Sequence, residues 1–173
     1  SLMDRGLDPM NVLIDRAHDK GLDFFTSLRL THSSDPKQSE HAHNWQFKID
    51  HPEWCLKGEH KYNFNWVYPE VHAGWLAIVE ETVNRYNIEG FEVDLVFQPY
   101  YFEEGEGKKN QNILTNFMRD VRKTVDEAAK KRGKPIVLGA RILPTEPGNQ
   151  AQGIDVATWI KEGLLDFVVP NFY

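Results

Sequence analysis

The residues best suited to chemistry are two carboxylic acids, Glu92 and Asp94, in a stretch with the pattern of a strand. They alternate with the apolar residues Phe91, Val93, Leu95 and Phe97. Successive side chains of a strand point to opposite faces, so both acids lie opposite the apolar set. An unpaired buried charge is costly. We therefore expect these acids either to have cationic partners or to take part in catalysis.

Two carboxyl groups on one face of a strand can act together in acid and base catalysis, and glycoside hydrolysis is one reaction that uses such a pair. In glycosidases one group donates a proton and the other acts as nucleophile or base, roughly 5.5 Å apart for retention and 6.5 to 9.5 Å for inversion. Asp94, near the C-terminal end of its strand, is the first catalytic candidate, and Glu92 is the second. Arg29 and Arg141 are natural counter-charges that would keep Asp94 ionised, as a nucleophile requires. The structural alternative is that both acids form salt bridges with arginines.

Polar and aromatic residues at or near the ends of predicted strands are candidates for substrate binding. They are Arg29, His32, Gln98, Tyr100, Arg141, Asn171 and Tyr173. Flat aromatic rings pack well against sugar faces, which makes Trp45, Trp54 and Trp66 further candidates. The alternative for these rings is internal packing. Trp75 and Trp159 follow helical spacing, so we expect them in the core.

Residues 32–72 form a predicted irregular segment far longer than a typical connection. It holds six of the seven histidines and three of the five tryptophans, a composition that favours a substrate-binding loop over disorder. His41 and His43, with His32 and Asp94, are the alternative: ligands of a metal-dependent hydrolase. Because an irregular loop does not fix the geometry of a His-x-His pair, we assign no metal ligand and expect no cofactor.

The composition is typical of one soluble α/β domain over residues 1–173. A net charge of −6 disfavours a nucleic-acid surface. No apolar run reaches the ~20 residues of a membrane span, and no signal peptide is visible. The single cysteine, Cys55, excludes an internal disulfide but leaves both an exported and a cytoplasmic bacterial location open.

Helical and strand patterns alternate along the chain. The spacing predicts helices over residues 9–20, 73–87, 110–132 and 155–162, strands over residues 22–31, 90–98, 135–143 and 166–172, and a loop over residues 144–153. This alternation predicts a parallel α/β sheet. A doubly wound sheet and a (β/α)8 barrel both satisfy it.

Two observations favour the barrel. The sequence lacks the Gly-rich phosphate turn of nucleotide-binding folds, and polar residues recur at strand ends, where a TIM barrel has its active site. Eight strands need about 250 residues, whereas the pattern predicts four βα units, so we expect about half of a barrel. The exposed strand edges of a half-barrel favour self-association.

Several stretches together resemble bacterial glycoside-hydrolase-like TIM-barrel proteins of uncharacterised type. They are "SLRLTHSSD" with Arg29, "NFNWVYPEVHAGWLAIVEETVNRYNIEGFEVDL", "QPYYF" and "GIDVATWIKEGLLDFVVPNFY". The resemblance implies a barrel and a carbohydrate substrate. Amylase-type barrels are similar in layout, with an aspartate nucleophile after the fourth strand and a glutamate acid after the fifth, which makes Glu146 the acid candidate. Glu92 departs from that layout, which has an arginine there.

These observations lead to one prediction and two alternatives. We predict a glycoside hydrolase that uses carboxylate catalysis at the C-terminal mouth of a TIM barrel. The first alternative is a barrel that binds carbohydrate without catalysis, in which the aromatic residues remain but no second carboxyl group lies at glycosidase distance. The second is a metal-dependent hydrolase that uses the His-rich segment.

Overall fold

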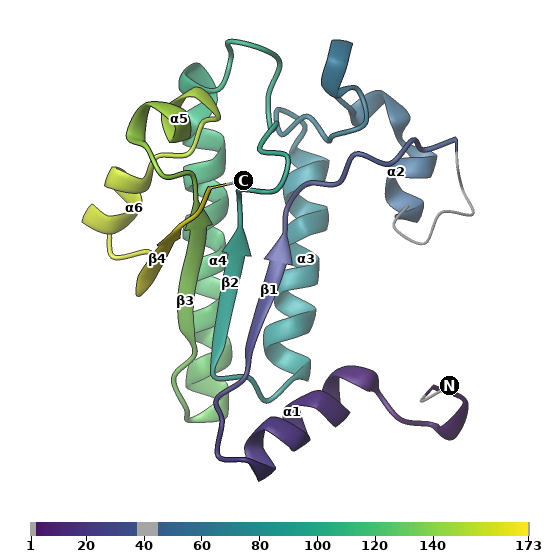
Figure 1. Ribbon diagram of the computed structural model, residues 1–173, viewed down its shortest axis with the longest axis vertical. Helices are drawn as coiled ribbons and strands as arrows, with labels where there is room; N and C mark the ends of the chain where they lie inside the picture. Colours follow the sequence, from purple (N-terminus) through teal and green to yellow (C-terminus); the bar gives the residue numbers. More distant parts are fainter. Residues whose placement is uncertain (1–2, 38–44, 173) are drawn as a thin grey trace.

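The computed structural model in Figure 1 describes residues 3–37 and 45–172. Its strands are parallel and form one sheet: β1 (Phe25–Arg29), β2 (Gly90–Asp94), β3 (Val137–Ile142) and β4 (Phe167–Pro170). Each lies inside a predicted strand. His41, His43 and Tyr173 fall outside the described residues, so what the sequence predicts for them stays a prediction.

The helices begin and end where local chemistry requires it. They are α1 (Pro9–Asp19), α2 (Gln46–Asp50), α3 (Pro69–Arg85), α4 (Gln111–Arg132), α5 (Glu146–Ala151) and α6 (Val156–Lys161). The Asp8 carboxylate accepts the Met10 N–H at the start of α1, and Asp155 accepts the Thr158 N–H at the start of α6. Gly133, with a φ of 71°, ends α4 in the left-handed conformation.

The strands follow one another in the order β1-β2-β3-β4. A doubly wound sheet would reverse its direction at a switch point, whereas this sheet grows in one direction only. Right-handed crossovers then place the connecting helices on one face, and α3 and α4 lie together behind the sheet in Figure 1. The other face carries the polar strand residues and corresponds to the inside of a barrel.

The core lies between the sheet and these two helices. Val93 of β2 and Leu138 of β3 are fully buried there, as are Val79 of α3 and Phe117 of α4. Trp159 is also fully buried, as predicted, and its Nε1–H donates to the Thr115 hydroxyl at 3.0 Å. None of the helices in the described part of the chain has the length and apolar character that crossing a membrane requires.

Two predicted boundaries are wrong. Residues 144–153 are predicted as a loop but contain the helix α5, whose N-cap Thr145 accepts the Gly148 N–H and which has a proline in its first turn. The predicted irregular segment 32–72 contains α2 and two short 3-10 turns, Pro52–Trp54 and Gly58–His60, and its end falls inside α3. In both places the helical pieces are too short to show a hydrophobic period.

On the inner face, the end of the sheet where the strands begin carries two aromatic rings. Phe25 and Phe167 lie with ring centroids 6.0 Å apart. A Cβ atom at Gly90 would lie 2.1 Å from the ring of Phe25, and one at Gly139 would lie 2.1 Å from the ring of Phe167. These two glycines let the rings lie flat on the sheet, so the polar residues Ser27 and Glu92 follow one layer above.

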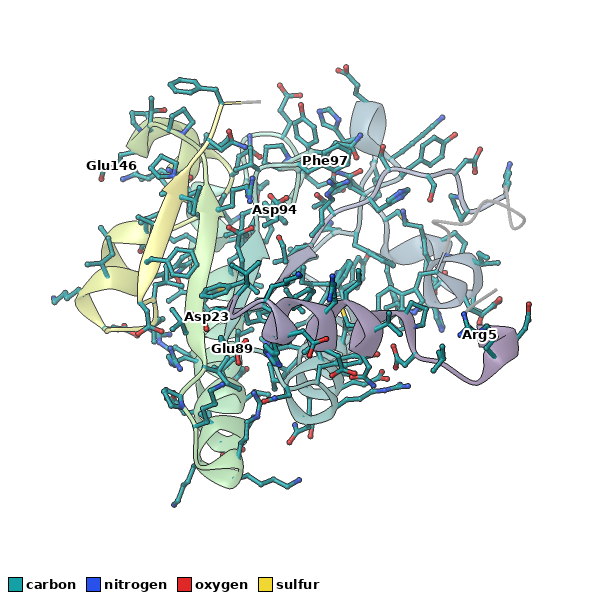
Figure 2. The ribbon with its side chains drawn as sticks, turned by 60° about the horizontal axis from the view of Figure 1, so that its bottom comes forward. Arg5, Asp23, Glu89, Asp94, Phe97 and Glu146 are labelled. Atoms are coloured by element: carbon teal, nitrogen blue, oxygen red, sulfur yellow. The ribbon has the colours of Figure 1, made fainter. Side chains whose placement is uncertain are left out.

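Glu89, the residue before β2, lies at the far end of the sheet from Asp94 (Figure 2). It joins three segments of the chain. Its carboxylate accepts hydrogen bonds from Lys134 Nζ at 2.6 Å and the Phe24 N–H at 2.8 Å, and lies 3.0 Å from His18 Nε2. Burial raises the pKa of Glu89, but the hydrogen bonds outweigh this effect and lower the pKa to about 2. The ionised carboxylate therefore stabilises the fold at neutral pH.

We expect Glu89→Gln to lower the free energy of unfolding at pH 7 by about 2 to 3 kcal/mol. Because the folded-state pKa is depressed, the wild-type advantage is present above the unfolded pKa and is lost as the pH falls through 4.5 toward about 2. Urea denaturation at several pH values measures it. Glu127→Gln, at an exposed position of α4, is the control and should change stability by less than about 0.5 kcal/mol. A loss that does not depend on pH would contradict this role.

Candidate active site

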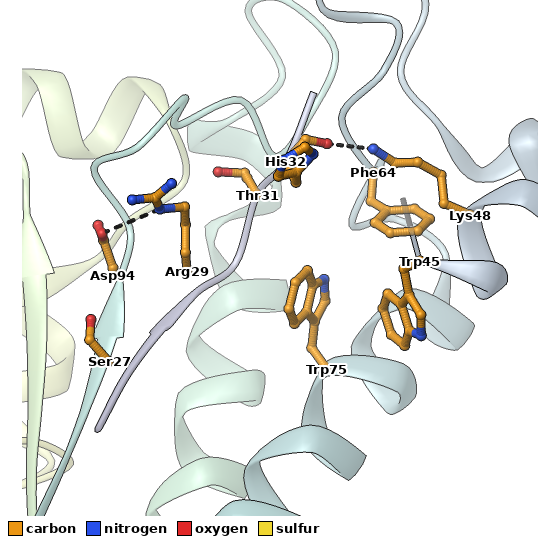
Figure 3. A pocket seen from close by; sticks show the side chains of 9 residues that line it. All are labelled: Ser27, Arg29, Thr31, His32, Trp45, Lys48, Phe64, Trp75 and Asp94. Atoms are coloured by element: carbon orange, nitrogen blue, oxygen red, sulfur yellow. Dashed lines mark hydrogen bonds and ion pairs between the residues drawn. The ribbon is translucent and has the colours of Figure 1, made fainter. Parts of the chain in front are cut away.

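A cavity of about 500 Å³, which we call the Asp94 pocket, opens beside the carboxyl ends of β1 and β2 (Figure 3). Its lining comes from the two strands, the segment after β1, α2 and α3. The lining residues are Ser27, Arg29, Thr31, His32, Trp45, Lys48, Phe64, Trp75 and Asp94. One end is therefore polar and the other is aromatic. Such a mixture of apolar walls and a few placed polar groups is typical of small-molecule sites.

Asp94 lies at the polar end, where its carboxylate is held but still reachable. Its Oδ1 accepts the Val96 N–H at 3.0 Å, and its Oδ2 lies 3.9 Å from Arg29 Nε. The side chain of Asp94 is 14% exposed. The Arg29 guanidinium also lies over the ring of Phe97, 3.8 Å from its centroid, which fixes the cation beside the acid.

Glu92 has a structural partner, one of the two roles that the sequence allows. It is 7% exposed and accepts hydrogen bonds from the Ser27 hydroxyl at 2.8 Å and from two nitrogens of Arg141 at 2.9 and 3.2 Å. The parallel register places Arg141 beside Asp94 along the sheet, yet its guanidinium binds Glu92 in the layer below. Of the two arginines expected beside Asp94, the structure places Arg29 there.

The aromatic end of the pocket depends on close packing around Trp45. The indole stacks on Phe47 at 4.6 Å and lies 5.4 Å from the ring of Trp75. Because Gly74 has no side chain, the indole can approach α3: a Cβ at Gly74 would lie 2.9 Å from it. Trp75, predicted as core, is 8% exposed and also lines the pocket.

Lys48 of α2 is a pocket residue that sequence reasoning missed. Its side chain is 3% exposed, and its Nζ donates to the backbone carbonyl oxygens of His32 and Ser34. Burial lowers the pKa of Lys48 to about 8. No signal in the sequence marks it, because α2 has only five residues. Ser27 was also missed, although it lies two residues before Arg29 on the same face and the period of a strand predicts that it shares the site.

Glu146, the predicted acid, does not line the Asp94 pocket. It is exposed in the first turn of α5, accepts a hydrogen bond from Gln150 at 2.9 Å, and borders a separate cavity of about 270 Å³ between β3, α5 and α6. Figure 2 shows Glu146 and Asp94 on different parts of the molecule. A proline-containing turn after β3 begins α5, and this turn carries Glu146 away from the strand end.

The remaining predicted binding residues are spread over the same end of the sheet. His32 lines the Asp94 pocket and also a neighbouring cavity of about 410 Å³, where Gln98 lies with a φ of 48°. Tyr100 stacks on His60, with ring centroids 3.3 Å apart, in a third cavity. Asn171 follows β4, and its N–H donates to the Ile142 carbonyl at 3.0 Å. The structure thus brings Arg29, His32 and Asp94 together in the Asp94 pocket.

Within residues 3–37 and 45–172, no group of three or more histidine, cysteine, aspartate or glutamate side chains could hold a metal ion. His41 and His43, the ligands of the metal alternative, lie outside the described residues.

Comparison with known proteins gives a consistent result. The profile of the family described as Glycosyl hydrolase-like 10 matches residues 1–115, more than half of the 173-residue chain. Glycosyl hydrolase YngK of Bacillus subtilis strain 168 is 26% identical over 98% of this chain and 39% of its own length. Glycosyl hydrolase DigH of Escherichia coli K12 is 21% identical over 97% of this chain and 46% of its own. The chain thus spans less than half the length of these curated relatives.

A solved structure of an alpha-amylase from Anoxybacillus superposes on the chain with a TM-score of 0.57 and 13% sequence identity. The superposition covers 93% of this chain and 32% of the amylase. At this identity the likeness concerns the fold alone. Together with the one-directional sheet, it confirms the predicted fold class, part of a TIM-barrel-type α/β fold.

We expect Glu92→Gln to lower the free energy of unfolding by about 1 to 3 kcal/mol, because it leaves the Arg141 guanidinium without its charged partner. Thermal and urea denaturation measure this loss. Glu146→Gln is the matched control: its carboxylate is exposed, so its stability should stay within about 0.5 kcal/mol of wild type. An unchanged stability of Glu92→Gln would show that the Glu92–Arg141 pair does not hold the inner face together.

Proposed function

The chain belongs to the Glycosyl hydrolase-like 10 family, and we propose that the protein hydrolyses a glycosidic bond in the Asp94 pocket. The observation that carries the proposal is the position of Asp94 and the groups around its carboxylate. Its carboxylate lies at the carboxyl end of an inner strand, faces a cavity, and has an arginine and a backbone N–H beside it. In barrel enzymes the catalytic groups come from this end of the strands.

The surroundings of Asp94 favour the role of nucleophile or general base. Both roles need an ionised carboxylate, and a hydrogen-bond donor, the Val96 N–H, and a cation, the Arg29 guanidinium, lie beside this one. A proton donor needs the opposite, an environment that favours the neutral acid. Among the described residues, the one ion pair of the Oδ2 atom is with Arg29 Nε at 3.9 Å, and Oδ2 is the oxygen that we assign to the reaction.

The aromatic end of the pocket would hold the sugar. Trp45 is half-buried, so part of its ring borders the cavity while Phe47 and Gly74 support it from behind. A pyranose presents C–H groups on its faces, and these pack against an indole. Ser27 and Thr31 line the same pocket as Trp45 and Asp94.

A second carboxyl group is needed for acid and base catalysis. Among the described lining residues of the Asp94 pocket, Asp94 is the only carboxylic acid. Glu92 is bound by Arg141 and Ser27, and Glu146 borders another cavity. We therefore propose that the proton donor comes from outside this lining, in a complete barrel of the size of the curated relatives.

The same observation favours a second candidate function, a barrel that binds carbohydrate without cleaving it. In that case the indole of Trp45 would bind the sugar, and Asp94 would accept hydrogen bonds from its hydroxyl groups. The two functions differ in turnover and not in binding, so the turnover of the wild-type protein separates them.

We expect Asp94→Asn in the full-length protein to lower the hydrolysis rate by roughly 10²- to 10⁴-fold. The loss follows because an amide cannot act as nucleophile or base. The measurement is the release of reducing ends from a panel of polysaccharides and oligosaccharides. Binding of the same glycans, measured by calorimetry, should change by less than about 10-fold, because the amide keeps the size of the carboxylate.

Asp120→Asn is the matched control. Asp120 is a half-buried aspartate of α4 that pairs with His72 at 3.0 Å outside the Asp94 pocket. It should leave hydrolysis unchanged. Wild-type turnover by the Asp94→Asn variant would refute the catalytic role, and binding without turnover by the wild type would favour the carbohydrate-binding alternative.

A further inference from the structure

We propose that Lys48 is a positioning residue that holds His32 in a single tautomer, with the proton on Nε2, at the wall of the Asp94 pocket. It extends the proposed function, since His32 would then serve as a hydrogen-bond donor near the bound sugar. The state of the imidazole itself can be tested without any substrate.

The first step of the argument is the unusual setting of Lys48. A lysine ammonium group is almost never fully buried unless it is paired, yet Lys48 is 3% exposed and no salt bridge joins it to a described carboxylate. Its Nζ has three hydrogen-bond donors. Two of them reach the carbonyl oxygens of His32 and Ser34, and the ammonium group lies 5.4 Å from the centroid of the Phe64 ring. Its hydrogen bonds are therefore with the backbone after β1.

The second step concerns the short turn that contains those two carbonyl groups. Between them the Ser34 N–H donates to His32 Nδ1 at 3.1 Å. An Nδ1 atom that accepts a hydrogen bond carries no proton, so a neutral His32 has its proton on Nε2. Lys48 binds the backbone on both sides of this short turn, and the turn is what brings the Ser34 N–H to the ring.

The third step is the anchoring on either side. The Thr31 hydroxyl donates to the Phe97 carbonyl, which ties the residue before His32 to the loop after β2. A second buried group near Lys48 is Cys55, which is 8% exposed. Lys48 is thus the one described cation that links α2 to the turn at His32, and removing its donors releases that turn.

The expected consequence for the proposed reaction is a change in binding and not in the chemical step. His32 lines the pocket next to Arg29 and Thr31. One neutral hydrogen bond contributes about 0.5 to 1.5 kcal/mol, which corresponds to about a 2- to 10-fold change in KM. The value of kcat should stay close to that of the wild type, because Lys48 does not touch Asp94.

The test is the ¹⁵N spectrum of the imidazole nitrogens in the full chain at neutral pH, with the His32 signals identified by their loss in His32→Gln. In the wild type we expect Nδ1 to show the shift of an unprotonated nitrogen and Nε2 that of a protonated one. In Lys48→Met, which keeps the length of the side chain but has no donors, both shifts should move toward the average of two exchanging tautomers. Lys48→Gln retains two N–H donors without the charge and should keep most of the wild-type pattern.

Lys61→Met is the matched control. Lys61 is exposed and lies over the ring of Tyr62, 5.2 Å from its centroid, so the His32 signals should not move. Thermal unfolding of each variant shows whether it is folded. A folded Lys48→Met protein with wild-type His32 shifts would overturn the proposal. So would a wild-type spectrum with the proton on Nδ1, which decides the question even if Lys48→Met does not fold. Neither result depends on whether Asp94 catalyses hydrolysis.

Discussion

The structure depends on one constraint: charged side chains on the inner face of the sheet must satisfy one another. Because the strands follow chain order, the long helices cover one face of the sheet. Polar side chains such as Glu92 lie on the other face, since no solvent is available on the face that the helices cover. The Ser27–Glu92–Arg141 group solves this in the middle layer. Since Arg141 pairs with Glu92, Arg29 is the described cation that pairs with Asp94, at 3.9 Å, and the Asp94 side chain remains 14% exposed.

The pattern of the sequence predicts the sheet and the inner face well. Period-2 alternation identifies the face of Glu92 and Asp94, and helical stripes locate α3 and α4, because both signals come from extended elements with one buried side. The direction of Asp94 into a cavity beside Arg29 follows from the same periodicity. The periodicity does not predict which carboxylate pairs with Arg141. Glu92 and Asp94 lie one layer apart on the same face, and the choice between them depends on the direction of the arginine side chain.

The parts that escaped prediction belong to short pieces of chain. α2 has five residues and α5 has six, too few for a period to appear. Lys48 acts through backbone carbonyl groups, and such contacts leave no mark on residue type or spacing. The aromatic content of the segment between β1 and α3 predicts a substrate-binding loop, which stays a prediction. Part of the segment forms a wall of the Asp94 pocket: Trp45 lies against α3 at Gly74, and Lys48 binds the backbone just after β1.

The two aromatic rings over Gly90 and Gly139 form the lowest layer of the inner face. Phe25 and Phe167 lie below Ser27 and Glu92, with ring centroids 6.0 Å apart. A Cβ atom at either glycine would lie 2.1 Å from a ring. An alanine at either position would therefore displace a ring and disturb the layer of Ser27, Glu92 and Arg141 above it.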